Sequence, residues 1–181
     1  MNDSSNHDIQ KINEKSTCDK NCNNNIDVDE FQYVNPNSNI QRITSKEIDI
    51  TSVLNSFDNS GNFGATVLFI GTVRNFSDNG KVSGMRYEAY LVMAEEGIKN
   101  IEIEVKKKWD VKEIRIINRI GDLKIGDNSI AIAISTPHSK DAFEACQFIL
   151  NKIKQGIPIW KNERLSDGKT KWVKGKTVKD V

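Results

Sequence analysis

The segment Ala65–Val73, ATVLFIGTV, limits the possible folds of this 181-residue chain more than any other part of it. Its residues carry no charge and are rich in β-branched and aromatic side chains, which predicts a buried strand. The following polar stretch SDNGK favours a turn, and Val82–Tyr90 is then predicted to be a second strand. We therefore predict that these two strands form a hairpin with a long loop.

A second pair of strands is predicted around the sequence GDLKIGD. The two segments that flank it have either alternating or continuous apolar side chains, as strands do; they are Ile114–Ile120 and Ser129–Thr136. The glycines and aspartates of GDLKIGD favour turns. Near the C-terminus, PIWKNERLSDGKTKWV is predicted to form two extended pieces around a turn at Asp167 and Gly168. The chain is therefore expected to be rich in antiparallel strands.

Apolar side chains at helical spacing predict helices over residues 50–57, 94–109 and 142–153. Ser139 is a suitable N-cap for the last of these, and Gly156 is a suitable stop. Cys146 lies on its apolar stripe and is expected in the core. Because hairpins and single helices follow one another without regular βαβ alternation, we predict an α+β domain with a mainly antiparallel sheet.

Composition narrows the class of protein. Lysine and arginine total 26 against 25 aspartate and glutamate, a formal net charge of +1 that gives no general reason to bind polyanions such as nucleic acid. No segment has the length and apolarity of a membrane span, and the first residues do not resemble a secretory signal. A cytoplasmic protein with reduced thiols is expected.

Residues 1–42 are rich in Asn, Asp, Ser and Lys and have almost no apolar periodicity, so a disordered tail is predicted, followed by one domain over 43–181. Cys18 and Cys22 within CDKNC have the residue type of a metal or redox pair. Nearby histidine is limited to His7 and no second cysteine pair exists, so we favour the interpretation that neither has such a role.

Cationic side chains stand beside several predicted segment boundaries. The chain has no glycine-rich phosphate loop, no HExxH sequence and no nucleophile elbow. The cations would suit a phosphate or carboxylate, although for each one taken singly we favour the plainer explanation of solvation or, for Lys154, of the helix dipole. If Lys154 and Lys161 lie close together, their repulsion should lower the pKa of one ammonium group. The candidates are Arg74, Arg119, His138, Lys154 and Lys161.

Five segments in order carry a resemblance to a known family. The match covers about residues 43–176, and its most distinctive part is the K-x3-P-x-WK-x-E pattern from Lys154 to Glu163. The chain resembles the large, catalytic subunit of molybdopterin synthase, the MoaE family. The segments are GATVLFIGTVRN, YEAYLVMAEEGI, NRIGDLKIGD, PHSKDAFEACQFI and LNKIKQGIPIWKNE, followed by DGKTKWV.

The resemblance implies a fold and a function. The fold would be an α/β hammerhead, and two such chains would form a central homodimer with a small ubiquitin-like subunit on each, a heterotetramer. The enzyme would be a sulfurtransferase that converts cyclic pyranopterin monophosphate (precursor Z) to molybdopterin, using the thiocarboxylate at the small subunit's Gly-Gly terminus. It would need no metal or organic cofactor of its own.

The resemblance also implies roles for individual residues. Lys154 and Lys161 match the family's active-site lysines. The residues that would bind the precursor are Arg74, Arg119, His138, Lys140 and Lys176. The chain differs from the usual family pattern at Asn118 and Ser139, where the family has His and Arg, and Lys140 could partly replace the missing guanidinium.

Two alternatives remain open at this point. One is a non-catalytic homologue that binds the ubiquitin-like partner as a scaffold. The other is an unrelated module that binds a small anion or a nucleotide.

Overall fold

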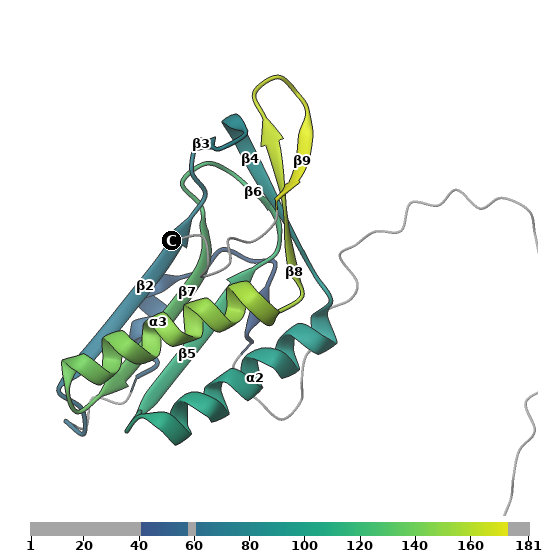
Figure 1. The fold of residues 1–181 in the computed structure, drawn as a ribbon. Coiled ribbons are helices and arrows are strands. Elements are labelled where there is room, and N and C mark those ends of the chain that lie inside the picture. The colour runs from purple at the N-terminus through teal and green to yellow at the C-terminus, as the bar shows by residue number, and fades with distance from the viewer. Residues whose placement is uncertain (1–40, 58–60, 174–181) are drawn as a thin grey trace, which may run out of the picture. The chain divides into compact units, whose positions relative to one another are not determined.

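A computed structural model describes residues 41–57 and 61–173 (Figure 1). The predicted tail with Cys18 and Cys22, and the predicted substrate residue Lys176, lie outside this range. The elements are β1 (Ile43–Thr44), α1 (Ile50–Asn55), β2 (Ala65–Thr72), β3 (Phe76–Ser77), β4 (Gly80–Ala89), α2 (Leu91–Lys108), β5 (Glu113–Arg119), β6 (Gly121–Leu123), β7 (Asn128–Thr136), α3 (Ser139–Gly156), β8 (Ile159–Leu165) and β9 (Thr170–Val173).

The first sheet has the strand order β1-β5-β7-β2. The pairing of β5 with β7 is antiparallel, which confirms the predicted second hairpin, while the short β1 runs parallel to β5. Helices α2 and α3 cover one face of this sheet (Figure 1) and pack on side chains such as Ile116 and Ile132. Helix α1 covers the other face, where Val53 and Phe57 join Ala131 and Ala133. The core is thus built on both faces of β7.

The second sheet contains β3-β4-β8-β9, with β6 also paired to β4. The predicted hairpin of β2 with β4 is therefore wrong, because β2 pairs with β7 and β4 pairs with β8. Val73, directly after β2, is buried with Tyr87 and Leu123 of the second sheet. The loop after β2 carries the chain from one sheet to the other. The β8–β9 hairpin confirms the predicted C-terminal pair.

The GDLKIGD segment does more than turn the chain. Gly121 has φ of 90°, a left-handed conformation that glycine adopts at low cost, and it directs the chain out of β5. The next residues then form β6 against β4, with Tyr87 opposite Gly121. One predicted turn is therefore a connection between the two sheets.

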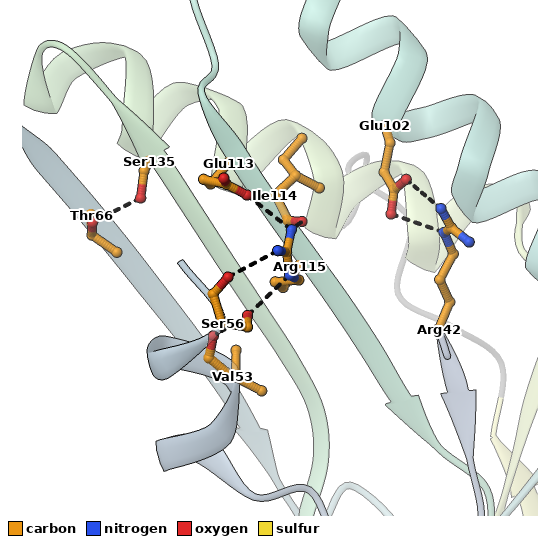
Figure 2. Close-up of polar contacts among 9 residues, drawn as sticks. All are labelled: Arg42, Val53, Ser56, Thr66, Glu102, Glu113, Ile114, Arg115 and Ser135. Carbon is orange, nitrogen blue, oxygen red and sulfur yellow. Dashed lines mark hydrogen bonds and ion pairs between the residues drawn. The ribbon is translucent and has the colours of Figure 1, made fainter. Parts of the chain in front are cut away.

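Three polar anchors hold the first sheet to its helices and strands (Figure 2). The buried guanidinium of Arg42 donates to both carboxylate oxygens of Glu102, at 2.9 and 2.7 Å, and fixes the start of β1 to α2. Arg115 of β5 donates to the Ser56 hydroxyl at 3.0 Å and to its carbonyl at 3.1 Å, which holds the end of α1. Thr66 and Ser135 hydroxyls meet at 2.8 Å across β2 and β7.

Both long helices lie where their apolar periodicity predicts them. Ala94, Ile98 and Val105 of α2 are fully buried, and Cys146 of α3 is in the core as predicted. The N-cap of α3 is His138, one residue before the predicted Ser139. No helix in the described part of the chain is long and apolar enough to span a membrane. Together these elements confirm the predicted α+β class.

Candidate active site

Two cavities meet beside the C-terminal end of α3 and the strand β8. The first, of about 460 Å³, lies between α3, the end of β5 and the β8–β9 hairpin. The second, of about 290 Å³, lies between β8, β4 and the loop after β2. Tyr87, Lys154, Lys161 and Val173 line both cavities. These residues form the wall that the cavities share.

Lys154 and Lys161 reach the shared wall from different elements. Lys154 lies in the last turn of α3, and Lys161 follows three residues after Pro158 in β8. Burial lowers the pKa of the Lys161 ammonium group, and the positive charges of Lys154 and Arg74 lower it further, while Glu163 opposes this effect. The predicted convergence of the two lysines is therefore found. A larger share of the shift comes from burial than from their repulsion.

The loop after β2 brings Arg74 to the second cavity. Its guanidinium carbon lies 5.1 Å from the centre of the Phe76 ring. The buried carboxylate of Glu163 accepts hydrogen bonds from Ser77 Oγ at 2.8 Å and Asn79 Nδ2 at 2.9 Å. Because Glu163 belongs to β8, these bonds tie the loop that carries Arg74 to the strand that carries Lys161.

Arg119 lines the first cavity together with Asn118. Arg119 Nη1 donates to Asp127 Oδ2 at 3.2 Å, and its side chain is 12% exposed. Ser129 in the same wall donates to the Gly71 carbonyl at 3.0 Å. Tyr87 stands beside it, and burial raises the pKa of its phenol, although a hydrogen bond with Ser129 partly offsets this. The remaining lining is mainly apolar, from Ile130, Leu150, Ile153, Ile157, Ile159 and the two tryptophans Trp160 and Trp172.

His138 and Lys140 lie away from these cavities within one chain. His138 caps the start of α3, whereas Lys154 is near its end, and 18 helical residues separate the two ends. At about 1.5 Å per residue, Lys140 and Lys154 are about 20 Å apart along the helix. Lys140 is exposed and lies 3.8 Å from Glu144. The structure therefore brings together Arg74, Arg119, Lys154 and Lys161, and leaves His138 and Lys140 apart from them.

The family model described as MoaE protein matches residues 43–156. The chain belongs to the MoaE protein family.

Other members of the MoaE family support this assignment. The chain is 39% identical over 130 residues to the molybdopterin synthase catalytic subunit of Thermoplasma volcanium, covering 72% of this chain and 94% of that protein. It is 42% identical over 109 residues to the protein of the same name from Staphylococcus aureus Mu50, covering 60% of this chain and 73% of that one. These relatives are enzymes of molybdopterin synthesis, so the predicted family and its enzymatic character are confirmed.

A solved structure supports the fold of this MoaE chain. The crystal structure of molybdopterin synthase from Staphylococcus aureus superimposes with a TM-score of 0.68 at 37% identity, covering 73% of this chain and 95% of that one. The similarity therefore covers most of both chains. The predicted fold class is therefore confirmed independently of the sequence pattern.

Two residues of this MoaE site were not among the predicted site residues. Tyr87 pairs with Lys161 across β4 and β8, and its ring centre lies 5.8 Å from Lys161 Nζ. Glu163 lies two residues after Lys161 in β8. Alternation along a strand places residues i and i+2 on one face, so Glu163 could have been inferred once β8 was recognised. Tyr87 could not, because its approach depends on which strand pairs with β8.

The arrangement suits anion binding combined with proton transfer. Arg74, Lys154 and Lys161 provide charge-assisted hydrogen-bond donors around the second cavity. A lysine with a lowered pKa can give up its proton closer to neutral pH and then act as a base. Among residues 41–57 and 61–173, no group of His, Cys, Asp or Glu side chains is arranged to hold a metal ion.

Proposed function

We propose that this chain is the catalytic subunit of a molybdopterin synthase. It would transfer sulfur from the C-terminal thiocarboxylate of a small ubiquitin-like subunit to cyclic pyranopterin monophosphate, precursor Z, in molybdenum cofactor biosynthesis. The observation that carries the proposal is the position of Lys154 and Lys161 in the wall between two cavities. A group in that wall can reach a sulfur donor on one side and a sulfur acceptor on the other.

The two cavities differ in chemistry as the two reactants do. Arg74 and the lysines give the second cavity the positive charge that a cyclic phosphate requires. The first cavity is largely apolar and is bordered by Trp160 and Trp172, which are about half exposed at 51% and 54%. An extended peptide without bulky side chains suits such a passage. We therefore assign the precursor to the second cavity and the partner's Gly-Gly tail to the first.

The cysteine in the described residues is poorly suited to carry the sulfur. Burial raises the pKa of the Cys146 thiol to about 11, so the nucleophilic thiolate is scarce at neutral pH. Cys146 also packs in the main core and lines neither cavity. A separate sulfur donor, bound from outside, agrees with these facts.

Each transfer can be written with the chain's own residues. The thiocarboxylate sulfur bonds to a carbon of the precursor as a C–O bond at the same carbon breaks, and the departing oxygen takes up a proton. Water then cleaves the bond between that sulfur and the acyl carbon. The water oxygen leaves in the partner's new C-terminal carboxylate, and the sulfur stays on the pterin. The water's protons must be accepted, and Lys161 is the candidate base because its pKa is lowered. Two such transfers form the dithiolene.

The partners follow from the same proposal. The relatives are called catalytic subunits, which implies a second kind of subunit in their assemblies. We propose a homodimer of this chain within a heterotetramer, located in the cytoplasm. His138, Lys140 and Lys176 remain precursor-binding residues by resemblance alone. The resemblance also assigns Arg119 to the precursor, but Arg119 lines the first cavity, which we assign to the partner's tail.

Substitution of the lysines tests the proposed activity. With preformed thiocarboxylated small subunit and purified precursor, Lys154→Ala should lower molybdopterin formation at least about a hundredfold, the size of a lost acid–base contribution. Lys161→Ala should also impair turnover, and the double variant should be hardly worse than the worse single one if the lysines act as a unit. Arg74→Ala should mainly weaken precursor binding.

Lys152→Ala is the matched control. Lys152 lies on α3 two residues before Lys154, lines neither cavity and pairs with Glu104 at 3.1 Å, so its loss should leave turnover unchanged. Near wild-type conversion by Lys154→Ala would refute the role of that lysine. A wild-type chain that binds the small subunit but forms no product would instead favour the scaffold alternative.

A further inference from the structure

Two hydrogen-bond donors in the first cavity lack partners. Asn118 at the end of β5 is 5% exposed, and its Nδ2 meets no acceptor among the described residues. The neighbouring Arg119 Nε is likewise buried without an acceptor in that part of the chain. Both residues line the first cavity. Buried donors in proteins are nearly always paired, so two unpaired ones in one cavity indicate a ligand that brings acceptors.

Two neighbouring polar groups of this cavity are already paired. Ser129 Oγ donates to the Gly71 carbonyl at 3.0 Å, and Arg119 Nη1 is paired with Asp127. The rest of the cavity is lined mainly by aliphatic and aromatic side chains. The ligand must therefore fit between apolar side chains and also carry hydrogen-bond acceptors that reach Asn118 and Arg119.

An extended glycine-rich peptide meets both requirements. It has no bulky side chains to fit between the walls, and each residue supplies a carbonyl oxygen with two lone pairs. Lys154 and Lys161 line the same cavity, so a chain end that follows the wall reaches the lysine pair. We propose that Asn118 Nδ2 and Arg119 Nε form a subsite that binds backbone carbonyl oxygens of the partner's C-terminal tail. This rests on the proposed function.

The test is a double-mutant cycle that combines substitutions in this subsite with removal of the partner's tail. The affinity of the full chain for the small subunit in its carboxylate form is measured by calorimetry, and again for a small subunit that lacks its final Gly-Gly. Asn118→Leu removes the donor at similar size and Asn118→Asp replaces it with an acceptor. Each should weaken binding of the intact partner about three- to tenfold, as expected for one hydrogen bond. Neither should change binding of the shortened partner.

Arg119→Lys tests the second donor, because it keeps the positive charge but has no group equivalent to Nε. We expect a similar loss, again confined to the intact partner. Asn162→Leu is the matched control: Asn162 also has a side-chain atom without a partner among the described residues, its Oδ1, but it lines neither cavity. It should leave both affinities unchanged.

The outcomes separate this subsite from the activity itself. Unchanged affinity of both Asn118 variants for the intact partner would overturn the subsite while leaving sulfur transfer in place. An equal loss with the shortened partner would also overturn it, as would weakened binding of precursor Z in place of the partner. A wild-type chain that binds neither form of the small subunit would refute the proposed partner, and the subsite with it. Melting temperatures of all variants exclude unfolding as the cause.

Discussion

At the scale of single residues, Lys161 is a cavity-lining side chain whose surroundings lower its pKa. Its ammonium group lies beside the Tyr87 ring. The positive charges of Lys154 and Arg74 lower its pKa, and the negative charge of Glu163 partly offsets their effect. Holding a buried ammonium group among other cations costs folding free energy. Such a cost is typical of a functional position, because a chain selected for stability alone would use a neutral side chain there.

The Lys161 pKa gives a signed prediction for stability. In the unfolded chain the ammonium group keeps its ordinary pKa of 10.5, whereas in the folded chain the pKa is lower. Between the folded and the unfolded pKa, the unfolded state binds more protons than the folded state. The free energy of unfolding of the wild type should therefore increase as pH rises through this window. Lys161→Met removes that gain. Its melting temperature relative to wild type should therefore fall as pH rises through the lowered pKa toward 10.5.

Lys99→Met provides the comparison for this measurement. Lys99 is an exposed residue of α2, so its substitution should shift the melting temperature by a similar amount at each pH. A difference in melting temperature between wild type and Lys161→Met that stays constant across the whole pH range would contradict the assignment of a lowered pKa to Lys161.

Some of the site could be predicted from the residues alone and some could not. Lys154 and Lys161 were recognisable because they stand at fixed spacing around Pro158 in a distinctive pattern. The unpaired donors of Asn118 and Arg119 were not predictable, since burial and missing partners depend on how β5, β7 and α3 close around them.

At the scale of elements, Gly64 sets how closely β2 begins beside the segment before α3. A β-carbon at this position would lie 2.7 Å from the Pro137 carbonyl oxygen. The Gly64 amide also donates to the Thr136 carbonyl at 3.1 Å. The close approach involves backbone on both sides, so neither can move without disturbing the pairing of β2 with β7.

Gly64→Ala should therefore destabilise the fold by about 1–3 kcal/mol, the usual range for overpacking. Gly156→Ala is the control, because a β-carbon there meets nothing within 4 Å. Alanine favours helices over glycine by about 1 kcal/mol, so this change should be neutral or slightly stabilising. Urea denaturation midpoints measure both, and equal midpoints for the two variants would show that the close approach at Gly64 is unimportant.

The elements themselves differed in how well their sequences predicted them. Helices α2 and α3 have apolar stripes that decide their position and buried face, because helical periodicity is local. The partner of β2 was not predictable in the same way. Its apolar sequence fits either a hairpin with β4 or the observed pairing with β7, and the choice depends on contacts between residues far apart in the sequence.

At the scale of the whole molecule, the described residues form two sheets joined by the loop after β2 and by β6, and the cavities lie where the sheets meet α3. The composition of the first 40 residues predicts a segment that buries little apolar surface. Neither the fold nor the reaction should depend on it.

A chain without residues 1–40 should therefore keep its melting temperature, its rate of sulfur transfer and its assembly. Light scattering should give a homodimer for the chain alone and a heterotetramer after addition of the small subunit, with or without the first 40 residues. A large fall in melting temperature on truncation would show that the segment is structural. Monomers under both conditions would count against the proposed assembly.

The wall shared by the two cavities links their occupancy through a proton. A negative charge bound near Arg74 offsets the positive charges that lower the Lys161 pKa, so an anion enters the second cavity together with proton uptake. Thermodynamic reciprocity then requires that protonation of Lys161 favours the anion by the same factor. Because Lys161 also lines the first cavity, we expect its protonation to couple the binding of a ligand there to the binding of an anion in the second cavity.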